Sequence, residues 1–304
     1  MTRMIMEFYR QTDGHRRPSC TAAERADRQK GTMMKRRIRE MSFAVGLVTV
    51  VASAAVAEFP RSPLRRCGAD AVVAGTVCLD KYEESVWRVP NATTTNASLV
   101  AKIQQGRATE ADLTAGGATQ LGTQGDDYTR CANNGQTCAN DIYAVSLPSQ
   151  IPAASITWFQ AHEACANAAK RLPTNAEWQV GANGTPDPGP DNGTTDCNTE
   201  NAGALSLTGA RAACVSTRGA FDMVGNLAEW VSDWVPAPTT CPGWANFSND
   251  DMCLSGASTT TNGPGALVRG GAFASLGGAS AGPLAIHVFQ PSHAANFVGF
   301  RCAR

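Results

Sequence analysis

Cysteine is the residue type with the clearest capacity for chemistry in this chain. Eleven cysteines occur among the 304 residues, and ten of them lie beyond residue 57. No two stand in a Cys-x-x-Cys spacing, which is the usual arrangement of thiolates around structural zinc. An even number without that spacing is typical of disulfide bonds in an oxidising compartment. The ten cysteines are at positions 67, 78, 131, 138, 165, 197, 214, 241, 253 and 302.

Histidine and serine are the other candidates for chemistry. Beyond residue 57 the histidines are His162, on a predicted helix, and His287 and His293, near a proline. We expect packing or surface roles for them rather than metal binding. Ser275 and Ser280 lie in a Gly/Ala-rich run without a Gly-x-Ser-x-Gly elbow or an evident His/Asp partner. Such hydroxyls are more typical of turns than of nucleophiles.

The N-terminal region predicts export. Residues 34–39 are basic, residues 41–56 are largely apolar, and the small residues that end at Ala57 suit signal peptidase. An apolar run of 16 residues is short of the ~20 needed for a membrane anchor. We therefore expect residues 1–33 to lie upstream of the true start, residues 34–57 to be a signal peptide, and no stable membrane anchor. The mature protein would be secreted or periplasmic.

Charge narrows the class of partner. Residues 1–57 hold 11 of the 26 basic and 5 of the 26 acidic residues, which leaves 15 basic and 21 acidic residues, a net charge of −6. A mildly acidic protein is a poor ligand for nucleic acid or for anionic lipid. It is compatible with cation binding, and the remaining 247 residues can form one domain.

Two helices must position the central part of this domain. Thr157 and Gln160 form a capping box, which predicts a helix from Trp158 to about Lys170. Its apolar face has i, i+3, i+4, i+7 spacing and comprises Ala161, Ala164, Cys165 and Ala168. A second capping box, Thr174 with Glu177, begins a short helix that ends near Gly181.

The rest of the chain predicts short strands and much loop. Residues 91–150 are polar and rich in Thr, Asn, Gly and Gln, and we interpret them as a surface insertion. Together these features predict a loop-rich α+β domain over residues 58–304. Strands are expected at 76–82, 86–89, 266–273 and 297–303.

Four motifs together resemble the formylglycine-generating enzyme family, whose domain is also called the sulfatase-modifying factor domain. They occur in the family's order, and the stretch from Cys78 to Glu83 resembles its opening strand. The resemblance covers about residues 67–304 and implies a C-type-lectin-like fold. The motifs are Arg171-Leu172-Pro173-Thr174-x-x-Glu177-Trp178, Gly219-Ala220-Phe221-Asp222-Met223-Val224-Gly225-Asn226-x-x-Glu229-Trp230, Arg269-Gly270-Gly271 and Gly299-Phe300-Arg301-Cys302.

The resemblance implies one disulfide, between Cys165 on the first helix and Cys302 in the last motif. Closing so long a loop would restrict the unfolded chain by about 4–5 kcal/mol on the entropy model. A reduced Cys165 in the core is the alternative. For the other eight cysteines many connectivities stay open, although local proximity suggests the pairs 67–78, 131–138, 197–214 and 241–253.

The resemblance also implies calcium, which prefers six to eight hard oxygen ligands. Asp222 and Glu229 match the family's side-chain ligands, and Gly225 and Leu227 match its carbonyl ligands. Asn198 and Thr199 resemble the first ligands of a second site. The alternative makes Asp222 and Glu229 a helix cap and a surface carboxylate.

The active-site motif is where the resemblance fails. The family binds copper(I) through the cysteine of Gly-Gly-Ser-Tyr-x-Cys and a second cysteine five residues later, and this chain has Ser275 and Ser280 there. A hydroxyl cannot replace a soft thiolate as a copper(I) ligand. We therefore expect no copper and no conversion of cysteine to formylglycine.

Two functions follow as hypotheses. The favoured one is a calcium-stabilised binding or structural module, without cysteine-to-formylglycine activity, for an extracytoplasmic protein or glycan. The alternative is an extracytoplasmic metal-dependent oxidoreductase of the same superfamily that uses a different active site; it rests on analogy alone.

Overall fold

The structure is a computed structural model that describes residues 66–186, 191–200, 203–236, 248–250, 252–253, 264–275 and 278–304. The chain divides into two units, residues 1–57 and 58–304, and every described residue belongs to the second. The predicted signal peptide and Cys241 lie outside the described residues. No described helix is long and apolar enough to cross a membrane.

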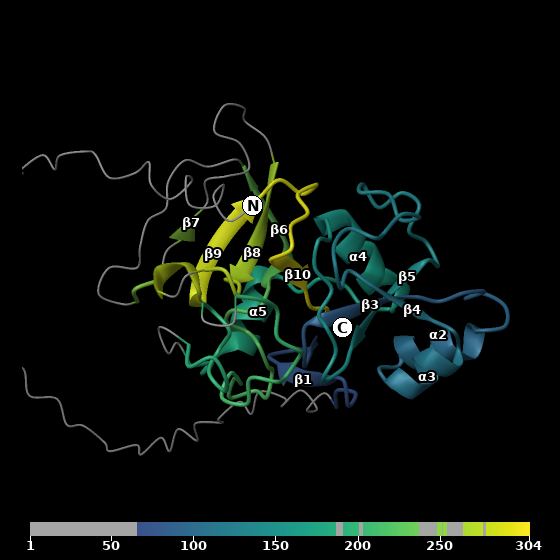
Figure 1. Cartoon of the computed structure of the whole chain (residues 1–304), viewed down its shortest axis with the longest axis horizontal. Helices are drawn as coiled ribbons and strands as arrows, with labels where there is room; N and C mark the ends of the chain where they lie inside the picture. The colour runs from purple at the N-terminus through teal and green to yellow at the C-terminus, as the bar shows by residue number, and fades with distance from the viewer. Residues whose placement is uncertain are drawn as a thin grey trace, which may run out of the picture. The chain divides into compact units, whose positions relative to one another are not determined.

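Three sheets organise the described residues (Figure 1). β1 (Ala71–Ala74) and β2 (Val77–Asp80) form a hairpin, and β3 (Glu84–Arg88) is the centre of a sheet between β4 (Thr119–Leu121) and β5 (Ile142–Ser146). The largest sheet has the order β10-β6-β8-β9-β7. Its strands are β6 (Ala228–Pro236), β7 (Met252–Cys253), β8 (Pro264–Gly270), β9 (Gly282–Phe289) and β10 (Val298–Phe300).

The two predicted helices are confirmed. α4 (Trp158–Asn167) and α5 (Asn175–Ala182) each begin with the expected capping box, Thr157 with Gln160 and Thr174 with Glu177. The predicted apolar face of α4 is fully buried. α4 packs on β5, and α5 packs on β1, β2 and β6. α4 ends earlier than predicted, because Ala169 adopts a left-handed conformation with φ 56°.

The interpretation of residues 91–150 as a surface insertion is wrong. This segment contains α2 (Ala97–Gln104), α3 (Glu110–Ala115), β4 and β5. Buried apolar side chains from all four elements join the main core, among them Leu99, Ile103, Leu113 and Leu121. The few apolar residues here have the spacing that two short helices and a fully buried strand need. The polar composition of the segment concealed that spacing.

The strand predictions were right where apolar runs were short and isolated. The predicted strands correspond to β2, β3, β8 and β10. β2 and β10 are shorter than expected at both ends, whereas β3 and β8 begin and end earlier than expected. β1, β4, β5, β6, β7 and β9 were not predicted. β6 and β9 are long strands of the largest sheet, and the buried residues of β9 recur at every third position instead of every second. The α+β class with short strands and much loop is confirmed.

Candidate functional site

An irregular turn ahead of β6 places the predicted calcium ligands. Asp222, Gly225 and Asn226 all have left-handed backbones, with φ of 57°, 73° and 57°. This conformation is uncommon for residues other than glycine and often marks a functional site. At Gly225 it is combined with close packing, because an added Cβ would overlap the carbonyl oxygen of Asn198.

Glu229, the last predicted ligand, is held by an arginine. Its Oε1 accepts a hydrogen bond from Arg301 Nη2 at 2.5 Å, and its Oε2 accepts from Arg301 Nε at 2.7 Å. Trp178 Nε1 also donates to Oε2, at 2.6 Å. Arg301 further donates to the carbonyl of Phe221 at 2.9 Å. All of these side chains are fully buried.

A third carboxylate, Glu83, completes the site. Its Oε1 accepts from the backbone N–H of Leu227 at 2.9 Å, and its Oε2 accepts from Asn226 Nδ2 at 2.5 Å. Burial, with repulsion from Asp222 and Glu229, raises the pKa of Glu83 well above its ordinary value. We call Glu83, Asp222, Glu229 and Arg301 the Arg301 cluster.

The Arg301 cluster carries an excess of negative charge. Asp222 Oδ2 accepts from the backbone N–H of Gly209 at 2.7 Å, and burial raises the pKa of Asp222 to about 6. With all three carboxyls ionised, the one guanidinium leaves a formal charge of −2. Glu229 is 0% exposed, so it is not a surface carboxylate, and no helix follows Asp222 that it could cap.

The donor set fits a calcium ion in type and charge. Hard carboxylate oxygens and a backbone turn with left-handed residues are typical of calcium sites. Asp222 would supply the principal carboxylate, and Gly225 and Leu227 lie on the same turn. Glu229 takes part through a carboxylate that Arg301 already binds. The ion would supply the positive charge that this buried cluster lacks.

Asn198 and Thr199 lie directly beside this turn. The carbonyl of Asn198 accepts from the backbone N–H of Asn226 at 2.8 Å, and its Nδ2 donates to Asn226 Oδ1 at 3.0 Å. Its Oδ1, the oxygen that this side chain could offer to a second calcium, accepts from Arg211 Nη2 at 3.3 Å. A cation is therefore already present at this oxygen, and the second site does not fit calcium in this arrangement.

Ser275 and Ser280 stand at the two positions where the resemblance implies thiols. Ser275 Oγ accepts from the backbone N–H of Ala272 at 2.9 Å, and Ser275 N–H donates to the carbonyl of Ala272 at 2.9 Å. Ser280 ends the short 3-10 helix η1 (Gly278–Ser280). Both serines are partly exposed. Ser275 thus has the bonding of a turn residue.

The histidines occupy aromatic surroundings. His162 stacks on Trp158 with ring centroids 5.2 Å apart, and His293 stacks on Phe289 at 4.7 Å. Burial lowers the pKa of His293. No histidine belongs to a set of potential metal ligands within the described part of the chain.

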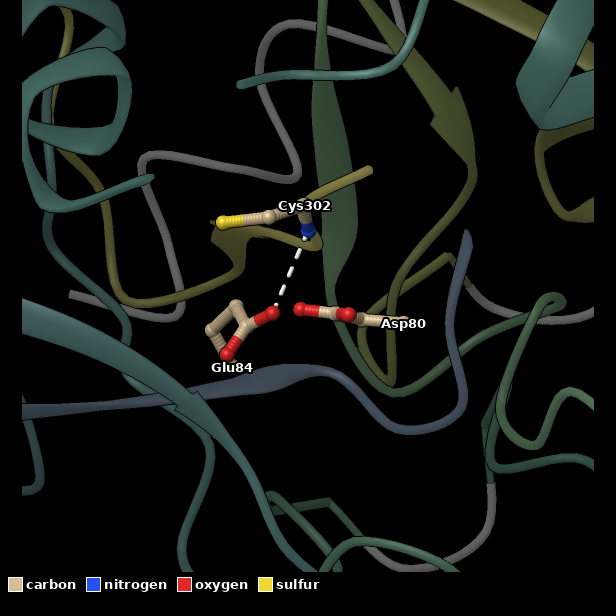
Figure 2. Close-up of side chains that lie close together, drawn as sticks. All are labelled: Asp80, Glu84 and Cys302. Atoms are coloured by element: carbon tan, nitrogen blue, oxygen red, sulfur yellow. Dashed lines mark hydrogen bonds between the residues drawn. The ribbon is translucent and has the colours of Figure 1, made fainter. Parts of the chain in front are cut away.

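One set of ligand-type side chains does converge among the described residues: Asp80, Glu84 and Cys302. Figure 2 shows the two carboxylates lying together next to Cys302, whose backbone N–H donates to Glu84 Oε1 at 3.2 Å. The sulfur of Cys302 is bonded to Cys165, so it offers no thiolate. These carboxylates surround Lys170 instead of a metal.

Lys170 is the centre of a second buried charge cluster. Its Nζ forms an ion pair with Asp80 and lies 3.3 Å from Asp70 Oδ2 and 3.8 Å from Glu84 Oε1. Arg304 pairs with Asp70 as well. We call Asp70, Asp80, Glu84, Lys170 and Arg304 the Lys170 cluster.

The sequence prediction missed both Lys170 and Glu83. A usable signal was present, because the apolar stretch between Val77 and Trp87 contains Asp80, Glu83 and Glu84. Carboxylates in a buried strand require counter-charges, although the sequence does not say which cations supply them.

Four disulfides fix the loops around these clusters. Cys165–Cys302 is present, with a sequence separation of 137. The local pairs Cys67–Cys78, Cys131–Cys138 and Cys197–Cys214 are present too. The suggested pair 241–253 lies outside the described residues.

Comparisons with known proteins give one family match. The model for the sulfatase-modifying factor enzyme 1-like domain matches residues 87–304. No curated protein matches the chain.

Several solved structures are similar in part. The I1 and U1 variants of the Major Tropism Determinant are 16% and 19% identical, with a TM-score of 0.39, over 76% of this chain and 51% of theirs. CarF is 18% identical, with a TM-score of 0.32, over 51% of this chain and 67% of its own. The chain thus spans about half the length of the tropism determinants, and these scores are too low to support an argument about function.

Proposed function

Because this chain belongs to the family of sulfatase-modifying factor enzyme 1-like domains, we propose that it is an exported, calcium-stabilised binding or structural module. In this proposal the domain keeps the family's scaffold and does not convert cysteine to formylglycine. One observation carries the proposal: Ser275 and Ser280 stand where the family's resemblance places two copper-binding thiols.

The difference between a serine hydroxyl and a cysteine thiolate as a metal ligand supports the loss of cysteine-to-formylglycine activity. Copper(I) is a soft ion that prefers thiolate, whereas a serine hydroxyl is hard and hardly ionises near neutral pH. Ser275 Oγ also accepts a backbone hydrogen bond from Ala272, which fits a role in holding the turn. With no thiol pair, the oxidation of a substrate cysteine has no site for the metal.

The Arg301 cluster supports calcium. Three buried carboxylates face one guanidinium, and a divalent cation would neutralise the formal charge of −2. Carboxylate and carbonyl oxygens are the ligands that calcium prefers. We propose one ion, bound by Asp222 with the carbonyls of Gly225 and Leu227 and with Glu229.

Export is supported by the four disulfides, because disulfides persist mainly in oxidising compartments. We propose a secreted or periplasmic protein whose partner is an extracytoplasmic protein or glycan. The net charge of −6 for residues 58–304 argues against nucleic acid as that partner.

Turnover of a thiol peptide tests the central claim. The purified protein is supplied with copper(I), oxygen and a cysteine-containing peptide, and mass spectrometry follows the aldehyde product. We expect no product and no stoichiometric copper. The double variant Ser275→Cys with Ser280→Cys is the matched comparison, in which copper(I) binding should appear. Turnover and bound copper in the wild-type protein would overturn the proposal.

A ligand screen tests the binding role. The purified protein is applied to a glycan array and used in pull-downs from extracytoplasmic fractions, with calcium and with EDTA. A ligand retained in calcium and reduced in EDTA supports a calcium-stabilised binding module. Absence of any ligand under both conditions argues for a purely structural role. No observation favours the alternative oxidoreductase, for which stoichiometric copper or iron in the purified protein would be required.

A further inference from the structure

Arg211 is a buried cation surrounded by oxygen atoms. Its side chain is 4% exposed. Nη2 donates to Asn198 Oδ1 at 3.3 Å, Nε donates to Ser206 Oγ at 3.1 Å, and Nη1 lies 3.7 Å from Asp191 Oδ1. A carboxylate, a carboxamide oxygen and a hydroxyl thus face one guanidinium.

The guanidinium is only partly satisfied there. Among the described residues, Arg211 Nη1 has no hydrogen-bond partner, and neither does the buried Oγ1 of Thr199. The carboxylate of Asp191 is shared with the backbone, because Oδ1 accepts from Gly193 N–H at 2.7 Å and Oδ2 accepts from Thr199 N–H at 3.0 Å and Glu200 N–H at 2.8 Å. The guanidinium of Arg211 therefore faces the oxygens of Asp191, Asn198 and Ser206.

The same oxygens form a set that a divalent cation prefers. Hard carboxylate, carbonyl and hydroxyl oxygens are the donors in calcium sites, and Asn198 with Thr199 is the pair that the sequence predicts for a second ion. A guanidinium in contact with Asn198 Oδ1 repels such an ion strongly at short distance. The presence of Arg211 therefore explains why this pair does not fit calcium.

We propose that Arg211 is a built-in cation which takes the place of a second calcium ion, and that its removal opens a divalent-cation site at Asn198, Thr199 and Asp191. In the wild-type chain this place then needs no metal. The inference goes beyond the calcium proposed at the Arg301 cluster, and its test does not require that ion.

The position of Arg211 also explains what a cation does there. The carbonyl and Nδ2 of Asn198 bind Asn226, and Ser206 N–H donates to Asn226 Oδ1 at 2.8 Å. Arg211 binds both Asn198 and Ser206, so it braces the turn that places Asp222 and Gly225. Because Arg211 is part of the chain, it stabilises this turn at any calcium concentration.

Calcium stoichiometry tests the proposal. Wild type, Arg211→Ala and Arg211→Lys are purified, equilibrated with calcium and dialysed, and calcium per chain is measured by elemental analysis and by titration calorimetry. Arg211→Ala should bind one more ion per chain than wild type, whereas Arg211→Lys, which keeps the charge, should not. Arg218→Ala is the matched control, because Arg218 is an exposed arginine on the same loop.

Asn198→Ala assigns the added ion. In the Arg211→Ala background it should remove the gained ion. Equal counts in Arg211→Ala and wild type would overturn the proposal. So would a gained ion that Asn198→Ala leaves in place.

Two further outcomes are also decisive. If Arg211→Ala is unfolded in EDTA, recovery of its circular dichroism spectrum on adding calcium supports the proposal, and failure to recover overturns it. A wild type with no calcium and an Arg211→Ala variant with one ion would refute the site proposed at the Arg301 cluster and support this one.

Discussion

The two buried charge clusters differ in how completely the chain neutralises them. Glu83 belongs to the Arg301 cluster and Glu84 to the Lys170 cluster, because neighbouring side chains of an extended segment point to opposite sides. The Lys170 cluster balances three carboxylates with two cations, Lys170 and Arg304. The Arg301 cluster balances three carboxylates with one.

This difference separates a cluster that the chain can neutralise by itself from one for which we propose a bound cation. Burial, with repulsion from Asp80, raises the pKa of Glu84 well above its ordinary value. One proton on Glu84 makes the Lys170 cluster neutral without any external ion. The Arg301 cluster needs two positive charges to reach neutrality, so a divalent cation suits it. Glu83 and Glu84, which are adjacent in the chain, thus belong to clusters with different charge balances.

The largest expected effect is the loss of the lysine that neutralises its cluster. Lys170→Met leaves Asp80 buried without its closer ion-pair partner, although Arg304 Nη2 still lies 3.8 Å from Asp80 Oδ1. Breaking a buried pair costs about 3–5 kcal/mol. Urea unfolding followed by circular dichroism should show a loss of that order in the free energy of unfolding. Calcium should not restore it. A loss below ~1 kcal/mol would mean that the Lys170 cluster is not a structural centre.

Calcium should produce the second effect, confined to the other cluster. A ligand present at 100 times its dissociation constant stabilises the folded state by about 2.7 kcal/mol. We expect thermal unfolding to shift upward in calcium relative to EDTA, and Asp222→Asn to abolish the shift. Asp126→Asn, at an exposed carboxylate, is the control and should keep it. A shift that survives Asp222→Asn would place the ion elsewhere.

The sequence predicted those elements whose local signals agree with their tertiary roles. The capping boxes of α4 and α5 are formed by side chains three residues apart, and the buried face of α4 needs only helical spacing. β6 was hidden because it lies in a sheet between β10 and β8, two strands that are distant in the sequence. The parallel pairing of β6 with β10 joins Ala228 to Val298, a contact that no local pattern reveals.

The candidate site was predictable as a set of residues but not as an electrostatic arrangement. The segment from Asp222 to Glu229 was identified because it is one continuous motif that resembles the family's calcium-binding segment. The other charged groups of the cluster come from distant parts of the sequence: Arg301 is 72 residues from Glu229, and Glu83, a third carboxylate, is 144 residues from Leu227. Arg211 lies only 13 residues from Asn198, yet nothing in its neighbours indicates that its side chain turns inward.

The two clusters should make separate contributions to the pH dependence of stability. A carboxyl whose pKa is raised in the folded state contributes stability that is present at low pH and is lost as the pH rises through the raised value. Glu83 and Glu84 both belong to this case. In EDTA, the free energy of unfolding should therefore fall with rising pH, by at most ~1.4 kcal/mol per pH unit for each proton.

Glu84→Gln and calcium should each remove a different part of this decrease in the free energy of unfolding with rising pH. Glu84→Gln removes the contribution of the Lys170 cluster in EDTA and in calcium alike. Saturating calcium removes the contribution of the Arg301 cluster, because the ion favours ionised carboxylates. Urea unfolding at several pH values, with and without calcium, separates the two. If calcium also abolishes the slope that Glu84→Gln removes, the clusters do not act independently.

The smallest expected effect concerns an ion pair of the same residue types outside the core. Lys102 Nζ lies 2.5 Å from Asp112 Oδ1, like the Lys170–Asp80 pair, but the lysine side chain is 49% exposed. Exposed pairs gain little, since water solvates both charges when they separate. Lys102→Met should shift the urea midpoint several-fold less than Lys170→Met does. If the two variants are equally destabilised, burial is not what makes Lys170 important, and the distinction between the two clusters would have to rest on the number of charges alone.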